Sequence, residues 1–143
     1  MSTEELCAPT EPRTRTQGTA DPMQLLSRVS HGHVATSLRA MPFVAPARHV
    51  VADGCVMLRM HAGLGYQRAC SGSVVAYGAD NFNSGHTGLW SVQCTGTIEP
   101  VEPTAALLEM YGSTPARVDG EPFEAVFMRL EPQFMTVHTF DYS

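Results

Sequence analysis

The stretch FVAPARHVVADGCVMLRMH, from Phe43 to His61, decides the fold of this chain. Two runs of mostly apolar residues flank an Asp-Gly dipeptide, which is typical of the two-residue turn of a β-hairpin. We therefore predict antiparallel strands over 43–51 and 55–61. Pro46 lies inside the first strand, where proline indicates an edge, a bulge or a missing ladder bond beside a ligand.

Other segments also predict strands joined by short connections. They are apolar or alternating and are bounded by turn-forming residues, and they span 33–38, 73–79, 89–101 and 123–140, the last with a bend at Glu131-Pro132. Short helices are predicted after an Asp-Pro pair at 21–22, over 64–72 and over 102–112. Because tight hairpins join consecutive strands, we predict a mainly β fold, an antiparallel sheet closed into a small barrel with short helices.

The length and composition indicate one folded domain. The chain has 143 residues, of which 43% are hydrophobic, and its formal charge is −5. Residues 1–20 show no periodicity, so we expect a disordered tail followed by a single domain over 21–143. The acidic charge disfavours nucleic acid and membrane surfaces, and no apolar run approaches the length of a membrane span. We expect neither kind of partner.

All nine basic residues are arginines, a composition typical of GC-rich bacterial genomes. No lysine ammonium is therefore available to bind a phosphate. Residues 1–20 contain no apolar run typical of a leader peptide, so we expect none, and the four cysteines form no Cys-x-x-Cys pair. We expect a cytoplasmic protein whose reduced cysteines act as small buried hydrophobes or exposed thiols.

The histidines and cysteines form no metal-ligand motif. His31 and His33 share one face if their segment is extended, but the other four histidines stand at no metal-motif spacing. We predict no metal site, and a haem ligand among the six histidines stays open. No Gly-x-Ser-x-Gly elbow occurs, and Cys70 lies near a helix end, where the dipole disfavours a thiolate. The catalytic residues are therefore unknown.

A second stretch, LRMHAGLGYQRA from Leu58 to Ala69, indicates an anion site. Arg59 ends an apolar strand, a turn with two glycines follows, and a helix begins after it. Backbone N–H groups in such a turn, together with the fork of an arginine, bind anions. The residues by themselves leave two interpretations open: a phosphate site, or a strand-end arginine in a surface ion pair.

The order of these segments resembles the pyridoxamine 5′-phosphate oxidase-like proteins, the flavin-binding split barrels, especially the small actinobacterial ones. The resemblance runs from about Met23 to His138. It rests on GHVATS (32–37), MPFVAPARHVVADGCVMLRM (41–60) and SVVAYGADNFNSGHTGLWSVQCTGTIEPV (73–101). It implies an antiparallel split β-barrel of the FMN-binding type, and a homodimer with flavin mononucleotide (FMN) at the subunit interface.

The family's flavin contacts map onto positions of this chain. The resemblance implies backbone contacts along the edge of the isoalloxazine ring, contacts on the phosphate side, and contacts from the partner subunit. The ring-edge residues are Pro46, Ala47 and Arg48. The phosphate-side residues are Arg59 and Met60, and the residues that reach the flavin from the partner subunit are Trp90 and Ser91.

The chain departs from the family pattern in the phosphate turn. Leu64 and Gly65 stand where the family has a hydroxyl-bearing residue and a lysine, and Arg68, one helical turn further on, is the candidate to replace that lysine. Two functions follow from the resemblance. One is an FMN-dependent oxidoreductase acting on a small molecule, and the other is a non-catalytic or repurposed split-barrel protein that binds a deazaflavin, a haem or another small ligand.

Overall fold

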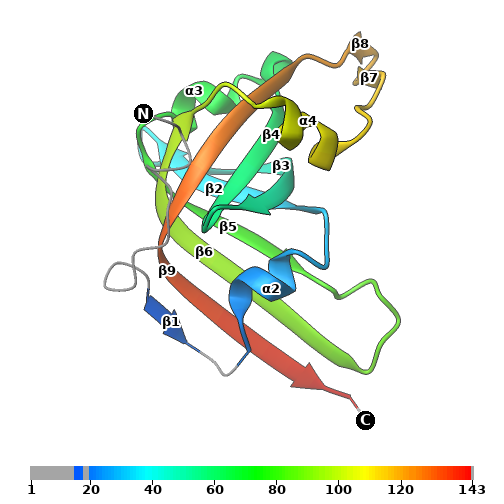
Figure 1. Cartoon of the computed structure of the whole chain (residues 1–143). Coiled ribbons are helices and arrows are strands. Elements are labelled where there is room, and N and C mark those ends of the chain that lie inside the picture. The colour runs from blue at the N-terminus through cyan, green and yellow to red at the C-terminus, as the bar shows by residue number, and fades with distance from the viewer. Residues whose placement is uncertain (1–14, 18–19, 143) are drawn as a thin grey trace.

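The computed structural model describes residues 15–17 and 20–142. Its main feature is a six-stranded antiparallel barrel with the strand order β9-β4-β3-β2-β5-β6, closed by the pairing of β6 with β9 (Figure 1). The predicted fold class is thus confirmed. The barrel strands are β2 (His31–Leu38), β3 (Met41–Ala52), β4 (Cys55–His61), β5 (Val74–Asp80), β6 (Gly88–Pro100) and β9 (Ala125–Asp141).

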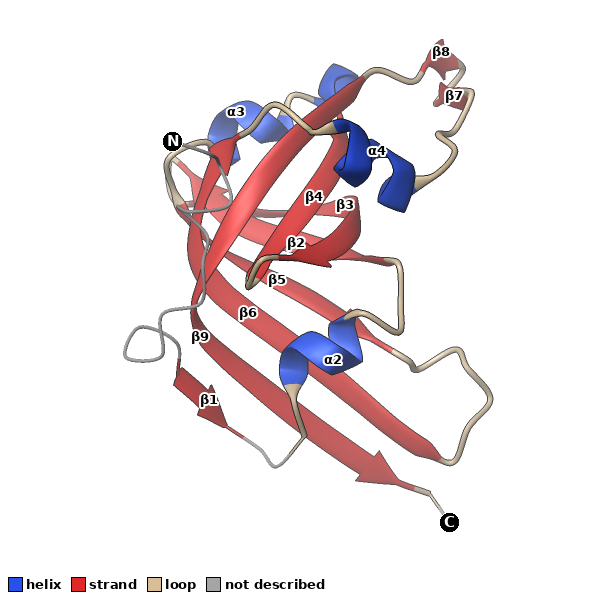
Figure 2. Ribbon diagram, in the orientation of Figure 1, coloured by secondary structure: helices blue, strands red, loops and turns tan. Residues whose placement is uncertain are grey.

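Short elements surround this barrel (Figure 2). Helix α4 and a small hairpin lie at the end of the barrel where β4 finishes, and α2 lies toward the opposite end. The helical segments are α2 (Pro22–Leu26), the single 3-10 turn η2 (Ala62–Leu64), α3 (Tyr66–Cys70) and α4 (Ala105–Tyr111). The minor strands are β1 (Arg15–Gln17), β7 (Arg117–Val118) and β8 (Glu121–Pro122).

The predicted hairpin of β3 and β4 is confirmed. Its turn residues Asp53 and Gly54 both adopt positive φ angles, of 52° and 76°, as a type I′ turn requires. The ladder between the two strands runs from the pair Ala52 and Cys55 to the pair Arg48 and Arg59. Strand β4 has the predicted bounds, and β3 begins two residues before the predicted start.

The first helix also begins as predicted. The Asp21 side chain accepts a hydrogen bond from the Met23 N–H at 3.1 Å, and Pro22 occupies the first turn. This cap satisfies one of the N–H groups that a helix start leaves without a partner. The helix is five residues long, and a short connection over 27–30 leads from it into β2.

Strand β9 differs from the prediction, which placed a bend between two strands. It is one strand of 17 residues that pairs along β6, and the register shifts opposite Thr95 and Gly96. Pro132 pairs with Gly96 and Phe134 pairs with Thr95, so one extra residue of β9 forms a bulge there. The bulge bends the strand without ending it.

The apolar residues form two cores on opposite faces of the barrel wall. The larger fills the barrel and includes Leu58 and Met60 of β4. The smaller lies outside the barrel, where Leu107 and Tyr111 of α4 cover Val50, Cys55 and Met57. Strand β4 is therefore buried on both faces, which explains why its sequence, apart from Arg59 and His61, is apolar and does not alternate.

A buried polar group connects three elements inside this fold. His49, which is 1% exposed, accepts from the Tyr77 hydroxyl at Nδ1 and donates from Nε2 to the Leu26 carbonyl at 2.8 Å. Burial lowers the pKa of His49 and raises that of Tyr77, so both side chains stay neutral. The pair joins α2 and β5 to β3 and is satisfied internally.

The N-terminal segment was expected to be a disordered tail over 1–20, and most of it lies outside the described residues. Arg15–Gln17 form β1, which pairs in parallel with β9 and was not predicted. Cys70 and Cys94 are buried free thiols, as expected, whereas Cys55 is disulfide-bonded, contrary to the expectation of reduced cysteines. None of the helices described is both long and apolar enough for a membrane crossing.

Candidate functional site

The barrel opens where β3 and β4 part. Their ladder ends at Arg48 and Arg59, after which β3 continues paired only with β2, and β4 continues paired with β9 as far as His61. Pro46 pairs with His33 of β2 and lies beyond the end of the β4 ladder. The missing ladder bond that Pro46 indicated is thus found at this split.

A cavity of about 160 Å³ occupies the split. Its wall combines two arginines, two histidines and an apolar surface. It brings together five of the nine residues that the sequence analysis proposed as cofactor contacts, Pro46, Ala47, Arg48, Arg59 and Met60, and adds His31, His61, Leu64, Pro115, Val118 and Phe123.

Arg59 is the most buried charged side chain of this cavity, with 6% of its surface exposed. Its guanidinium carbon lies 5.4 Å from the ring centre of Tyr111 and 5.7 Å from that of Phe123. Its buried Nε has no hydrogen-bond partner. Burial and the nearby Arg48 lower the pKa of Arg59, yet an arginine stays protonated in proteins. The cavity therefore contains a buried cation with an unused donor.

Arg48 has a different role, because backbone carbonyls take up its donors. The guanidinium donates to the carbonyls of Ser30 and His49 on one side. On the other side it donates to Met110 and Tyr111 at 3.3 Å. It thereby fixes the C-terminal end of α4 against β3, where the last carbonyls of a helix favour a cation.

His31 and His61 were not proposed as cofactor contacts, and the structure places both at the cavity. Partial burial, followed by Arg48 and Arg59, lowers the pKa of His31. The His61 ring is 8% exposed and stacks on Phe123 with 5.4 Å between ring centres. Its Nδ1 accepts a hydrogen bond from the Glu124 N–H at 3.1 Å. The position of His61 directly after the Arg59-Met60 pair was the one available signal.

The turn after β4 contributes less to the cavity than its sequence suggested. Leu64 lines the cavity, whereas Gly65 and Arg68 do not. Gly65 ends η2 with a φ angle of 77°, and Arg68 is exposed on α3. The predicted helix over 64–72 is in fact η2 followed by the five-residue α3. Neither Gly63 nor Gly65 therefore lines this cavity.

Trp90 and Ser91 lie on β6, away from the cavity. Trp90 is 8% exposed and packs within the barrel core. Ser91 lies on the opposite face of the strand and is half-buried. The indole of Trp90 thus faces its own barrel, and Ser91 lies on the other face of β6. Within the described part of the chain, no three His, Cys, Asp or Glu side chains gather to hold a metal ion.

The structure therefore belongs to the class of split antiparallel β-barrels, and it has an arginine-lined cavity at the split. The family model for pyridoxamine 5′-phosphate oxidase matches residues 19–139. The chain therefore belongs to this family, as the sequence analysis expected. An uncharacterised protein of Mycobacterium tuberculosis is 38% identical over 79 residues. The match covers 52% of this chain and 52% of the relative, so it spans about half of each.

Solved structures share this fold at low sequence identity. The FAD-binding protein of Mycobacterium smegmatis has a TM-score of 0.65 at 22% identity, covering 85% of this chain and 94% of that one. A FAD-binding protein of Mesorhizobium loti has a TM-score of 0.59 at 17% identity, covering 82% and 91%. These likenesses support the split-barrel fold.

Proposed function

We propose that this protein binds a flavin in the split between β3 and β4 and acts as an FMN-dependent oxidoreductase on a small molecule. The observation that carries the proposal is Arg59, a buried cation with an unpartnered Nε inside a cavity. A buried charge without a counter-charge is costly, whereas a bound anion supplies both counter-charge and acceptor. The phosphate of FMN is such an anion.

The remaining wall suits a flat aromatic ring system. Pro46 and Ala47 offer an apolar strand edge, and Phe123 and Leu64 add apolar surface beside the arginines. A flavin combines an apolar ring with a charged tail, which matches this division. The bound flavin supplies redox chemistry, while the chain positions it and excludes water. The FAD-binding neighbours and the family support a flavin as the ligand.

The cavity of one chain is too small for a whole cofactor. Pockets that enclose a drug-sized ligand have volumes of roughly 300–1,000 Å³, and this one has about 160 Å³. We therefore propose that a second copy completes the site in a homodimer, with Ser91 as a candidate contact. Sedimentation of the purified chain tests this step, and a monomer in the presence of flavin contradicts it. The cytoplasmic location stays a prediction.

The central experiment titrates the purified full-length protein with FMN and follows the visible flavin spectrum. Wild type should bind, and Arg59→Ala should weaken binding by roughly 10- to 100-fold, because a hydrogen bond to a charged group is lost. Arg28→Ala is the matched control, since Arg28 is exposed beside α2 and outside the cavity. Equal affinity of wild type and Arg59→Ala would show that Arg59 does not hold the phosphate.

The second candidate function is a binding protein without flavin chemistry. The absence of Gly65 and Arg68 from the cavity favours it, because the turn then adds no charged group to Arg59. A protein that binds FMN but does not turn over with NADH or NADPH as electron donors would support this alternative. Tighter binding of a deazaflavin or of haem than of FMN would identify a repurposed pocket.

A further inference from the structure

Arg59 and His61 form a pair of donors on the same face of β4. Both side chains line the cavity and both contact the Phe123 ring, Arg59 through its guanidinium and His61 through stacking. Residues two apart on a strand share a face and lie roughly 7 Å apart. Two donors at this spacing on one face suit a tetrahedral oxyanion, whose oxygens can each accept a hydrogen bond.

The hydrogen bonding of His61 leaves one ring nitrogen available. Nδ1 accepts from the Glu124 N–H, so the neutral ring carries its proton on Nε2. The Ala62 N–H donates in turn to the Glu124 carbonyl at 2.8 Å, which holds the same segment beside the turn. Within residues 20–142, Nε2 has no hydrogen-bond partner. It is an oriented N–H donor that packs against Gly63, on a residue that lines the cavity.

Gly63 makes room for this orientation. A Cβ placed on Gly63 would lie 2.4 Å from the His61 Nε2, so a larger residue would displace the ring. The φ angle of Gly63 is not in the left-handed region, so its backbone does not require glycine. The space for the imidazole is what this glycine provides.

We propose that the His61 Nε2–H binds the phosphate group of the flavin together with the Arg59 Nε. Two observations carry this inference: the unpartnered, buried Arg59 Nε and the single free donor of an imidazole that Glu124 and Phe123 hold in place. The inference rests on the proposed flavin function. It assigns the second phosphate donor to His61, which follows Met60. The turn after His61 has Leu64 and Gly65, and it provides neither a hydroxyl nor an ammonium.

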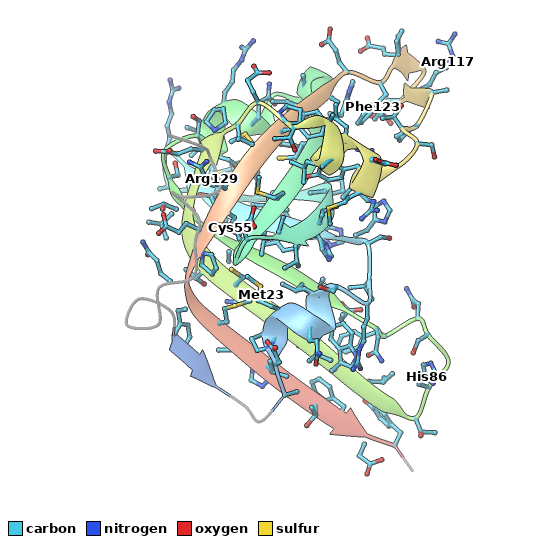
Figure 3. All side chains as sticks on the ribbon, viewed as in Figure 1. Met23, Cys55, His86, Arg117, Phe123 and Arg129 are labelled. Carbon is cyan, nitrogen blue, oxygen red and sulfur yellow. The ribbon has the colours of Figure 1, made fainter. Side chains whose placement is uncertain are left out.

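The experiment compares FMN with riboflavin, which lacks the phosphate. His61→Phe should weaken FMN binding by roughly 10- to 100-fold and leave riboflavin binding within threefold of wild type. His61→Gln keeps an N–H near the place of Nε2 and should retain most of the FMN affinity. Gly63→Ala should imitate His61→Phe, because it displaces the ring. His86→Ala is the matched control, since His86 lies in a loop far from Phe123 (Figure 3).

The outcomes separate this inference from the proposed function. Wild type that binds neither flavin overturns both. Wild type that binds FMN while His61→Phe binds it equally well, or loses riboflavin in the same proportion, overturns only the role of His61. Should His61→Phe fail to fold, nitrogen NMR of wild type decides. FMN should shift the His61 Nε2–H signal and riboflavin should not, and equal shifts with the two flavins contradict the inference.

Discussion

Arg48 and Arg59 stand directly opposite each other in the last pair of the β3–β4 ladder. Among the residues that the structure describes, neither guanidinium has a carboxylate within ion-pair distance, and the ion pair found is that of Arg129 with Glu99. Like charges directly opposite on neighbouring strands destabilise a sheet. The barrel therefore contains an electrostatic cost at the point where it splits, and an anion bound there would offset it.

Inorganic phosphate should therefore raise the melting temperature of the ligand-free protein more than sodium chloride does at equal ionic strength. Arg59→Met removes the repulsion and keeps an apolar stem against Tyr111 and Phe123. This variant should be at least as stable as wild type without phosphate, and it should lose the specific effect of phosphate. Thermal melts in the two salts measure both effects, and an equal response of wild type and variant to phosphate would contradict the anion site.

The two candidate phosphate arginines should differ in their effect on FMN binding. Arg68 is exposed on α3 and does not line the cavity, whereas Arg59 is buried in it. Arg68→Ala should change the FMN dissociation constant by less than about threefold, against a loss of one to two decades for Arg59→Ala. Fluorescence titration of the two variants side by side measures this difference. A larger loss in Arg68→Ala would assign the phosphate to α3.

The hydrogen bond between Tyr77 and His49 should contribute to stability. Tyr77→Phe leaves the buried His49 Nδ1 without its donor, at a cost of about 1–3 kcal/mol in the free energy of unfolding. Tyr66→Phe is the control, because Tyr66 is half-buried and stacks on Phe43 with 5.1 Å between ring centres. That control should stay within about 0.5 kcal/mol. Urea denaturation measures the free energy of unfolding of both variants. Equal losses in the two variants would show that the hydrogen bond does not contribute to stability.

The same histidine should make the fold sensitive to acid. Burial lowers the pKa of His49 below its ordinary value of 6.5, so the unfolded chain takes up a proton there before the folded one does. The stabilisation is present above pH 6.5 and is lost as the pH falls through the lower, folded-state pKa. The slope is at most about 1.4 kcal/mol per pH unit. Urea titrations between pH 7 and 5 should show a smaller slope in His49→Gln, and identical slopes would contradict the assignment.

Gly96 should not tolerate a side chain. A Cβ on Gly96 would lie 1.9 Å from the Glu131 carbonyl oxygen of β9, at the bulge that bends this strand. Gly96→Ala should destabilise the barrel by about 3 kcal/mol, because backbone must move to admit the methyl group. Gly88→Ala on the same strand is the control, since a Cβ there meets no atom within 4 Å. Equal melting temperatures of the two variants would contradict the close approach of β6 and β9.

The parts of the fold that local chemistry controls were predictable from the sequence. The Asp53-Gly54 turn, the start of α2 at Asp21 and the bounds of β4 follow from residues that are neighbours in the chain. The long β9 was predicted as two strands, because Glu131-Pro132 resembles a strand break. The partner strand decides otherwise, since pairing with β6 continues on both sides of the bulge.

The candidate site shows the same division. Pro46, Arg48 and Arg59 follow from the hairpin and the family resemblance. The hairpin ladder aligns Arg48 with Arg59, and Pro46 lies just beyond its end, at the same cavity. The sequence alone does not assign His61 to this site, because nothing in its own neighbourhood reveals its hydrogen-bond partner. That partner, Glu124, is 63 residues further along the chain.

By itself, the sequence determined most of the barrel strands, the turn between β3 and β4, the family and the arginines on which the site is built. Only the tertiary structure decided that β3 and β4 part after Arg48 and Arg59, and that the segment around Phe123 closes over the gap. The physical reason is that a strand pattern specifies which residues share a face. The choice of neighbour for each strand edge depends on segments far away in the chain. The cavity depends on them too, because it forms where β3 stays paired with β2 and β4 stays paired with β9.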